Sequence, residues 1–392
     1  MIAQNSQKCF QLAKNHKTVK IPHPKIYILK LFIGKKMKRY TGLIENYRSR
    51  LPVSETTRII SLGEGNTPLI ELHNIPRMIG KDIKIYVKFE GLNPTGSFKD
   101  RGMTLAVTKA VEAGSQAIIC ASTGNTSAAA AAYAVRAGIQ AFVLIPEGKI
   151  ALGKLAQTLM YGAKIIQING NFDRGMALVK EVADLAPVTI VNSINPFRIE
   201  GQKTAAFEIV DELGFAPDFH CLPVGNAGNI TAYWKGYDEY ATDRVCGNRP
   251  VMCGYQAAGA APFVEGAMID NPETIATAIR IGHPQSWDLA WNAQKQSGGW
   301  FDKCSDEKIL AAQKMLSQFE GIFCEPASAA SLAGALNDIH TGKIPDGSTI
   351  VCTLTGNGIK DPEIAMMQCA DSKPVTIEAS LDAVKKAILD NF

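Results

Sequence analysis

The sequence lacks the residue spacings that mark several chemical classes of protein. It has no HExxH or comparable histidine pattern and no CxxC pair, so nothing in its 392 residues predicts a metal site. The patterns GxGxxG and GxxxxGK followed by Ser or Thr are also missing, which argues against a dinucleotide-dependent oxidoreductase and a nucleoside-triphosphate enzyme. No run approaches the roughly 18 apolar residues of a membrane span. The nine cysteines are odd in number and scattered, which is typical of reduced thiols and favours a cytoplasmic protein.

Acidic residues are absent from one end of the chain. Residues 1–44 hold ten of the 41 Lys and Arg and none of the 37 Asp and Glu, so the net charge of +4 conceals a remainder with more acids than bases. Such a body lacks the basic face that nucleic-acid binding requires. We therefore expect neither a nucleic acid nor a membrane as partner, and any anion site must be local.

Residues 1–36 are basic, free of acids and interrupted by Pro22 and Pro24. A targeting segment, an extension, and upstream sequence translated from a misplaced start before Met37 all fit this composition. Transit peptides are typically rich in Arg and Ser, whereas this segment has only lysines and one serine. We expect an extension outside the folded body.

From residue 38 onward, short apolar runs alternate with stretches of helical period. This alternation predicts parallel sheets covered by helices on both faces, and so an α/β fold. The predicted strands are 85–89, 117–121, 141–145, 164–168, 188–191, 219–224, 251–255 and 349–354. The predicted helices are 40–50, 98–113, 125–137, 152–161, 172–185, 202–213, 228–240, 306–319 and 327–339.

We expect two lobes, each a mostly parallel sheet covered by helices. Residues 37–92 are an N-terminal segment that lies largely with the large lobe, residues 93–190 form a smaller lobe, and residues 191–392 form the large lobe. Ligands of such folds sit outside the carboxyl ends of the strands, where the loops described next are expected.

A single lysine stands at a loop-to-helix junction in the stretch NPTGSFKDRG, residues 93–102. Ser97 can act as N-cap and Asp100 can complete a capping box, so a helix should begin near Phe98. Lys99 then lies in the first turn, where the helix dipole disfavours an ammonium group and favours the neutral, nucleophilic amine. A solvated lysine at a helix start fits the same local pattern.

Further polar loops follow predicted strands. The loop STGNTS (122–127) opens a helix and suits an amino-acid carboxylate, although a simple helix cap has the same pattern. In VGNAGN (224–229) two glycines let backbone amides approach a phosphate. Arg198, in NSINPFRIEGQKT (192–204), suits a phosphate, a carboxylate or a structural ion pair. Thr355 ends the last strand where its hydroxyl can face a ligand, and Glu325, in EPASAAS (325–331), precedes a helix that it would simply cap.

Together these motifs resemble the threonine synthase family, which are pyridoxal-phosphate enzymes of the tryptophan-synthase β-subunit fold type, also called fold type II. The resemblance covers residues 38–362 through the order and spacing of GEGNTPL, NPTGSFKDRG, STGNTS, NSINPFRIEGQKT, PVGNAGN, EPASAAS and LTGNGIKDP. Residues 1–36 lie outside it.

The resemblance implies a role for a set of site residues. Lys99 would hold pyridoxal phosphate as a Schiff base, Asn125 would hydrogen-bond the ring hydroxyl of the cofactor, and Thr355 would contact its pyridine nitrogen. The cofactor phosphate would be bound by the main-chain amides of Gly225, Asn226, Ala227, Gly228 and Asn229. The substrate carboxylate would be bound by Ser122, Thr123 and Thr126, and the substrate phosphate by Asn192, Ser193 and Arg198.

The implied activity is that of a carbon–oxygen lyase acting on a phosphate. It converts O-phospho-L-homoserine and water to L-threonine and phosphate, the last step of threonine biosynthesis, with Lys99 moving protons at Cα and Cβ. A pyridoxal-phosphate-dependent serine or threonine dehydratase is the close alternative, because it needs the same lysine and glycine loop but no second phosphate site. A binding protein that kept the fold and lost the chemistry is a further alternative. Dimers are usual for this fold type, so we expect a homodimer.

Overall fold

The computed structural model describes residues 39–146, 152–169, 178–179, 181–183, 186–370 and 374–390. The chain divides into two units, residues 1–40 and 41–392, and every element named below belongs to the second unit. The predicted extension 1–36 and most of the predicted helix 172–185 lie outside the described residues.

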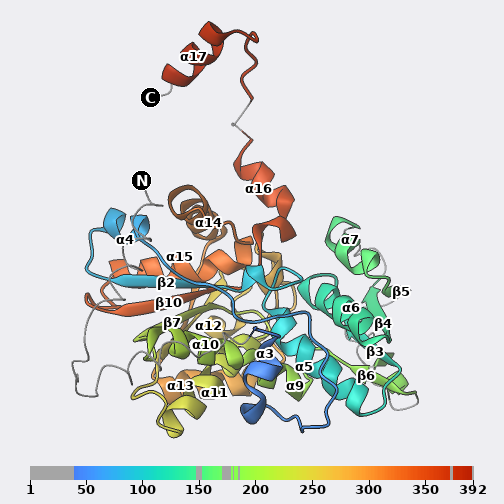
Figure 1. The fold of residues 1–392 in the computed structure, drawn as a ribbon. Coiled ribbons are helices and arrows are strands. Elements are labelled where there is room, and N and C mark those ends of the chain that lie inside the picture. Colours follow the sequence, from blue (N-terminus) through green and yellow to red (C-terminus); the bar gives the residue numbers. More distant parts are fainter. Residues whose placement is uncertain are drawn as a thin grey trace, which may run out of the picture. The chain divides into compact units, whose positions relative to one another are not determined.

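The larger sheet has six strands in the order β1-β2-β10-β7-β8-β9. All neighbouring strands run parallel except β1, which pairs antiparallel with β2. The last strand in the chain, β10, lies between β2 and β7 and therefore joins distant parts of the sequence (Figure 1). The strands are β1 Leu69–Glu71, β2 Lys84–Phe89, β7 Phe219–Pro223, β8 Val251–Ala257, β9 Trp300–Cys304 and β10 Thr349–Leu354.

The smaller sheet has four parallel strands in the order β5-β4-β3-β6. They are β3 Ala117–Ala121, β4 Gln140–Pro146, β5 Lys164–Ile168 and β6 Val188–Ile190. Every residue of β3 is buried, as expected for a parallel strand with both faces covered.

The helices between the strands complete the α/β pattern (Figure 1). They are α3 Leu43–Asn46, α4 Asn74–Ile79, α5 Lys99–Glu112, α6 Asn125–Ala137, α7 Leu152–Met160, α9 Pro196–Gln202, α10 Thr204–Leu213, α11 Gly228–Thr242, α12 Pro262–Glu265, α13 Trp287–Ser297, α14 Asp306–Glu320, α15 Pro326–His340, α16 Pro362–Gln368 and α17 Leu381–Leu389. Short 3-10 turns are η1 Arg48–Arg50, η2 Glu90–Leu92, η3 Thr277–Ile279 and η4 Gly358–Lys360.

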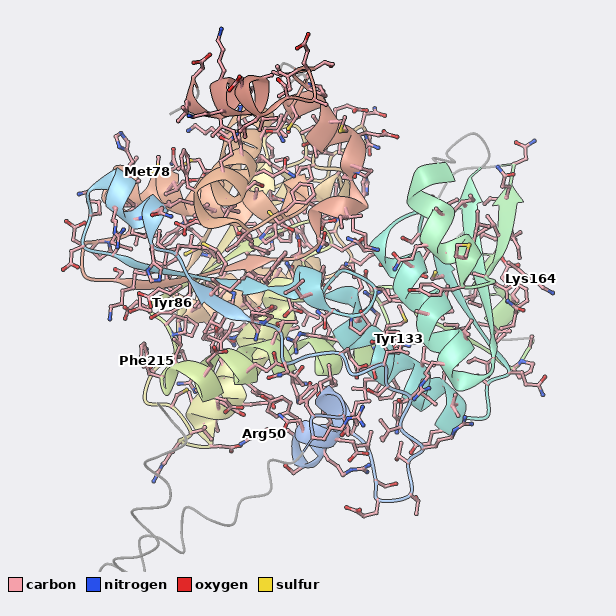
Figure 2. The ribbon with its side chains drawn as sticks, turned by 45° about the horizontal axis from the view of Figure 1, so that its top comes forward. Arg50, Met78, Tyr86, Tyr133, Lys164 and Phe215 are labelled. Atoms are coloured by element: carbon pink, nitrogen blue, oxygen red, sulfur yellow. The ribbon has the colours of Figure 1, made fainter. Side chains whose placement is uncertain are left out.

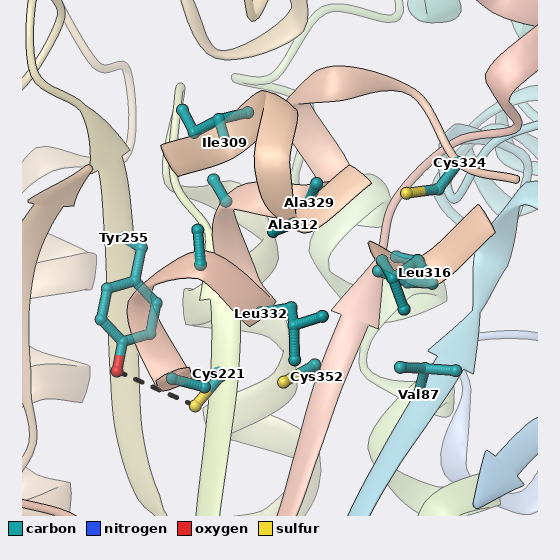
Figure 3. Close-up of a cluster of buried hydrophobic side chains, with 14 of the residues drawn as sticks. Val87, Cys221, Tyr255, Ile309, Ala312, Leu316, Cys324, Ala329, Leu332 and Cys352 are labelled. Atoms are coloured by element: carbon teal, nitrogen blue, oxygen red, sulfur yellow. Dashed lines mark hydrogen bonds between the residues drawn. The ribbon is translucent and has the colours of Figure 1, made fainter. Parts of the chain in front are cut away.

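Side chains alternate between two cores along the strands of the larger sheet. In β10, Ile350, Cys352 and Leu354 enter a core with α14 and α15, whereas Val351 enters the core on the other face with α10, α11 and α13. Figure 3 shows the first of these cores, with Leu316 of α14 and Leu332 of α15 near Cys352. The two cores bury both faces of the sheet, so its strands are held in register from both sides.

Alanine-rich α6 packs against the smaller sheet. Its residues Ala129 to Ala132 share a core with Ile118 and Cys120 of β3, and short side chains allow this close approach. Tyr133 of α6, labelled in Figure 2, is fully buried and donates to Glu64 at 3.0 Å. This bond fixes the glycine-rich stretch 63–65 against α6.

The predicted α/β class and the parallel sheets are confirmed, and the strands 117–121, 164–168 and 349–354 match to the residue. The predicted helix 40–50 is wrong in part, because the segment breaks into α3 and η1 at Tyr47. The stretch 196–202, interpreted as loop, is helix α9. The division into two lobes stays a prediction.

Candidate active site

A pocket of about 1780 Å³ lies at the carboxyl ends of strands from both sheets. Ala121 at the end of β3, Pro223 at the end of β7 and Thr355 after β10 all line it. All the predicted site residues line this one pocket, although they come from five separate stretches of the chain: Lys99, Ser122, Thr123, Asn125, Thr126, Asn192, Ser193, Arg198, Gly225, Asn226, Ala227, Gly228, Asn229 and Thr355.

Lys99 is the first residue of α5, as the sequence predicted to within one position. Its ammonium nitrogen lies 4.1 Å from the centre of the Phe98 ring. The pKa of Lys99 is lowered to about 7, mainly by burial and also by the nearby Arg198 cation, whereas Glu325 acts in the opposite direction. The sequence predicted a lowered pKa for Lys99 from the helix dipole. In the structure, burial and the Arg198 cation are the causes that lower it.

The capping box predicted for this helix is wrong. The Ser97 hydroxyl accepts from the Lys99 amide at 3.4 Å, but Asp100 does not complete the box, because its carboxylate accepts from the backbone and hydroxyl of Thr95 at 2.7 and 2.5 Å. Asp100 therefore closes the loop that precedes Lys99. The same loop is tied to the end of β10, because the Phe98 amide donates to the Thr355 carbonyl at 2.9 Å.

Helices α5 and α9 cross with their backbones in close contact. A Cβ on Gly201 would lie 2.0 Å from the Arg101 carbonyl oxygen, and one on Gly102 would lie 2.9 Å from the Arg198 carbonyl oxygen. Only glycine allows this approach. The crossing sets Arg198 of α9 at a fixed place relative to Lys99 of α5.

Arg198 and Gln202 stand one turn apart on α9, and both line the pocket while remaining almost fully buried. Arg198 donates from Nη1 to the Val191 carbonyl at 3.2 Å. Among the residues that the structure describes, its Nε and the Gln202 Oε1 have no hydrogen-bond partner. Burial also lowers the pKa of Arg198 to about 10. Buried, unpaired polar groups facing a pocket suit a charged ligand, since leaving them unpaired is costly. The ion pair considered for Arg198 is not formed in the described part of the chain.

Asn192 has a bond that the sequence did not indicate. Its side chain accepts from the Ala121 amide at 3.0 Å and donates to the Ala121 carbonyl at 3.1 Å. It thereby joins the loop after β6 to the end of β3. Any contact with a ligand must use what remains of its hydrogen-bonding capacity.

The glycine loop 225–229 turns from β7 into α11. Ala227 has φ +62°, and a Cβ on Gly225 would lie only 3.1 Å from the Ile279 Cα, so both positions are shaped for a tight backbone turn. The Asn229 side chain donates to the Pro223 carbonyl at 2.6 Å and so holds the turn from behind. The loop thus presents backbone amides at a helix start, which is the geometry that binds phosphate.

The loop 122–126 begins α6 without a side-chain cap. Gly124 occupies the N-cap position, and the Ser122 hydroxyl accepts from the Gly124 amide at 3.2 Å. The simple-cap interpretation of this loop is therefore not supported. Its hydroxyls and amides line the pocket beside Lys99.

Glu325 lines the pocket, and its side chain does not make the contact that the sequence indicated. It occupies the N-cap position of α15, but its carboxylate makes no cap bond and instead accepts from Asn125 Nδ2 at 3.0 Å. Lys360, which donates to Gln157 at 2.5 Å, was likewise not identified. A Glu before a Pro-initiated helix has the local signal of a cap, so only tertiary structure could reveal its direction.

Neither a metal-binding group of His, Cys, Asp and Glu nor a helix able to cross a membrane occurs in the described ranges. The eight cysteines that are described are free thiols, and all but Cys369 are buried.

A lysine of lowered pKa lines the same pocket as a glycine loop whose backbone amides can bind phosphate. This combination fits pyridoxal phosphate, which needs a nucleophilic amine and hydrogen-bond donors for its phosphate.

The fold and the site together define a pyridoxal-phosphate dependent enzyme. A family model described as "Pyridoxal-phosphate dependent enzyme" matches residues 60–356, and the chain belongs to this family. Pyridoxal phosphate is therefore its cofactor. The structure of maize serine racemase shares the fold, with a TM-score of 0.68 and 23% identity over 85% of this chain and 98% of that one.

Curated relatives narrow the class further. The threonine synthase of Synechocystis sp. is 57% identical over 350 residues, covering 89% of this chain and 91% of the relative. The threonine synthase of Mycobacterium tuberculosis strain H37Rv is 59% identical over 340 residues, covering 86% of this chain and 94% of the relative. These relatives confirm the predicted resemblance: within its family, this chain groups with the threonine synthases and is a lyase acting on an amino-acid substrate.

Proposed function

We propose that the chain converts O-phospho-L-homoserine and water to L-threonine and inorganic phosphate, using pyridoxal phosphate held by Lys99. The observation that carries this proposal is a buried cation in the same pocket as Lys99. Arg198 lines the pocket with an unpartnered Nε in the described part of the chain, and it would form an anion site separate from the glycine loop 225–229. One phosphate site serves the cofactor, and the other is available to the substrate.

The cofactor, when bound, supplies an electron sink for charge that develops on the substrate. The backbone amides of residues 225–229 would bind its phosphate, Asn125 would hydrogen-bond its ring hydroxyl, and Thr355 would contact its pyridine nitrogen. The amine of Lys99 would hold it covalently and would move protons at Cα and Cβ of the substrate. A pKa of about 7 suits both tasks, because the amine exchanges a proton readily near neutral pH.

The substrate is oriented by two groups of residues. Ser122, Thr123 and Thr126 bind its carboxylate at the start of α6. Arg198, with Ser193 and the remaining bonding capacity of Asn192, binds its phosphate, so the leaving group is fixed by a buried cation. Phosphate leaves from Cγ and water then adds at Cβ, so that one water enters for each phosphate released.

We further propose two lobes, a homodimer and a cytoplasmic location.

The experiment is to incubate the purified holoenzyme with O-phospho-L-homoserine and to measure phosphate and amino-acid products together. We expect phosphate and threonine in equal amounts, and no product from unphosphorylated L-homoserine. A dehydratase would instead form a 2-oxo acid and ammonia, and would consume L-threonine or L-serine. Formation of 2-oxobutanoate as the main product would reject the proposal.

A further inference from the structure

Glu325 is the only acidic side chain that contacts both Asn125 and Thr355 in the described residues. Its Oε2 accepts from Asn125 Nδ2 at 3.0 Å, and its Oε1 accepts from the Thr355 hydroxyl at 3.3 Å. Glu325 is 5% exposed and lines the pocket. Its carboxylate therefore does not cap α15, and it links the two residues that are proposed to contact the cofactor ring.

The position of this carboxylate is fixed by the backbone of residues 325 and 356. The Glu325 amide donates to the Gly356 carbonyl at 3.0 Å, and a Cβ on Gly356 would lie 2.5 Å from the carboxyl carbon of Glu325. Ser328 supports the same arrangement, because its hydroxyl lies 2.9 Å from that of Thr355 and accepts from the Gly356 amide at 2.9 Å. A side chain held so closely has little freedom to turn away from the pocket.

The charged and titratable groups around Glu325 come from two elements and from the chain just before it. Lys99 of α5 and Lys360 of η4 interact with it electrostatically, and the neighbouring Cys324 thiol precedes it in the chain. Burial is the largest cause and raises the pKa of Glu325 above its ordinary value, although the Asn125 bond and the two lysines act to lower it. In return, Glu325 raises the pKa of Lys99 against the effects of burial and Arg198. Among the residues that the structure describes, Glu325 is thus the acid that opposes the lowering of the Lys99 pKa.

We propose that Glu325 is a positioning residue that orients Asn125 and Thr355 toward the cofactor ring and supplies the negative charge facing the Lys99 nitrogen. This inference rests on the proposed function, since it concerns the same lysine and the same two ring contacts. It assigns a purpose to a buried acid, and it predicts that the charge, more than the volume, of residue 325 matters.

The experiment titrates the visible absorbance of the holoenzyme with pH, which reports the proton on the Lys99 nitrogen. Glu325→Gln keeps the size and one acceptor oxygen but removes the charge, and it should move the midpoint about one pH unit lower, the usual effect of losing one nearby opposite charge. Glu325→Asp should lie between the parent and Glu325→Gln. Glu363→Gln is the matched control, because Glu363 lines the mouth of the same pocket but is exposed.

A cofactor-loaded Glu325→Gln protein with the midpoint of the parent would overturn the inference, even if its melting temperature or activity fell, because a merely structural role leaves the titration unmoved. An equal shift in Glu363→Gln would also overturn it. If Glu325→Gln does not fold, Glu325→Asp decides, and a midpoint equal to that of the parent rejects the inference. A parent protein without any visible band would reject the proposed function itself.

Discussion

Arg198 is a buried cation whose hydrogen bonds are only partly satisfied. The residue is 2% exposed, and its guanidinium donates from Nη1 to one backbone carbonyl and leaves Nε without a partner in the described part of the chain. Its position near Lys99 lowers the pKa of that lysine. Arg198 therefore has two effects, since it offers a phosphate site and favours the neutral amine of Lys99.

Replacing Arg198 with Ala should raise the KM for O-phospho-L-homoserine about 10- to 100-fold, since a hydrogen bond to a charged group is worth about 1.5–3 kcal/mol. Steady-state kinetics across substrate concentration would measure it. Arg280→Ala is the control, because Arg280 lines the same pocket but is half-exposed beside Glu273, and its KM should stay near that of the parent. An unchanged KM in Arg198→Ala would count against the second phosphate site.

The sequence predicted Lys99 but not Glu325, and the difference is physical. Lys99 follows a turn and begins a helix, and both signals are local. The direction of the Glu325 carboxylate depends on Asn125, which is 200 residues away. Asp100 shows the same limit: its spacing from Ser97 indicated a capping box, yet Thr95 binds it more closely.

At the scale of elements, the crossing of α5 and α9 fixes the lysine and the arginine of the pocket relative to each other. These helices lie side by side (Figure 1), and they carry Lys99 and Arg198. The sequence missed α9 because Asn195-Pro196 has the composition of a turn. In the structure Pro196 is the first residue of the helix, and the Asn195 side chain caps it by accepting from the Phe197 amide at 3.0 Å.

Gly201→Ala should reduce the free energy of unfolding by about 1–3 kcal/mol, because the new Cβ would overlap the backbone of α5. It should also lower kcat, since the helices must separate and shift Lys99 relative to Arg198. Urea unfolding and steady-state kinetics would measure the two effects. Gly247→Ala is the control, because nothing lies within 4 Å of a Cβ there. Equal stability of the two variants would show that the crossing tolerates a side chain.

At the scale of the whole molecule, a buried network of four charges ties together segments that are far apart in sequence. Arg101 of α5 bonds Glu90 of η2 and Glu208 of α10, each at 2.6 Å, and Lys88 of β2 lies 2.8 Å from Glu208. Burial alone would raise the pKa of Glu208, but Arg101 and Lys88 outweigh it and bring the pKa to about 2. The network holds α5, and with it Lys99, against the larger sheet.

Glu208→Gln should therefore cost about 3–5 kcal/mol of unfolding free energy at neutral pH, because it leaves buried cations without their partner. In the parent, the stability from Glu208 is fully present above pH 4.5 and is lost as pH falls toward 2, since the unfolded chain binds that proton first. Urea unfolding at several pH values should show a shallower acid loss in the variant. Asp238→Asn, in an exposed pair with Arg249, should change stability by less than about 1 kcal/mol. A similar cost in both variants would contradict the importance of burial.

The order of the strands could not be predicted from the sequence. Local apolar runs indicated most of the strands, but the insertion of β10 between β2 and β7 depends on contacts between distant parts of the chain. Strand β9 was missed because it is half-exposed and carries charged residues, so neither the alternating nor the continuous apolar pattern is clear. Helix α13 was also missed. The predicted site residues nevertheless meet, because each follows a strand and parallel strands end at one edge.

The most direct test of the chemistry at this site is to reduce the holoenzyme with borohydride and locate the modified residue by peptide mass spectrometry. We expect the visible band to disappear and a single pyridoxyl group to remain on Lys99, with no covalent label in Lys99→Ala. A label on Lys360, the other half-buried lysine of the pocket, or a protein that takes up no pyridoxal phosphate would contradict the assignment on which the proposed function rests.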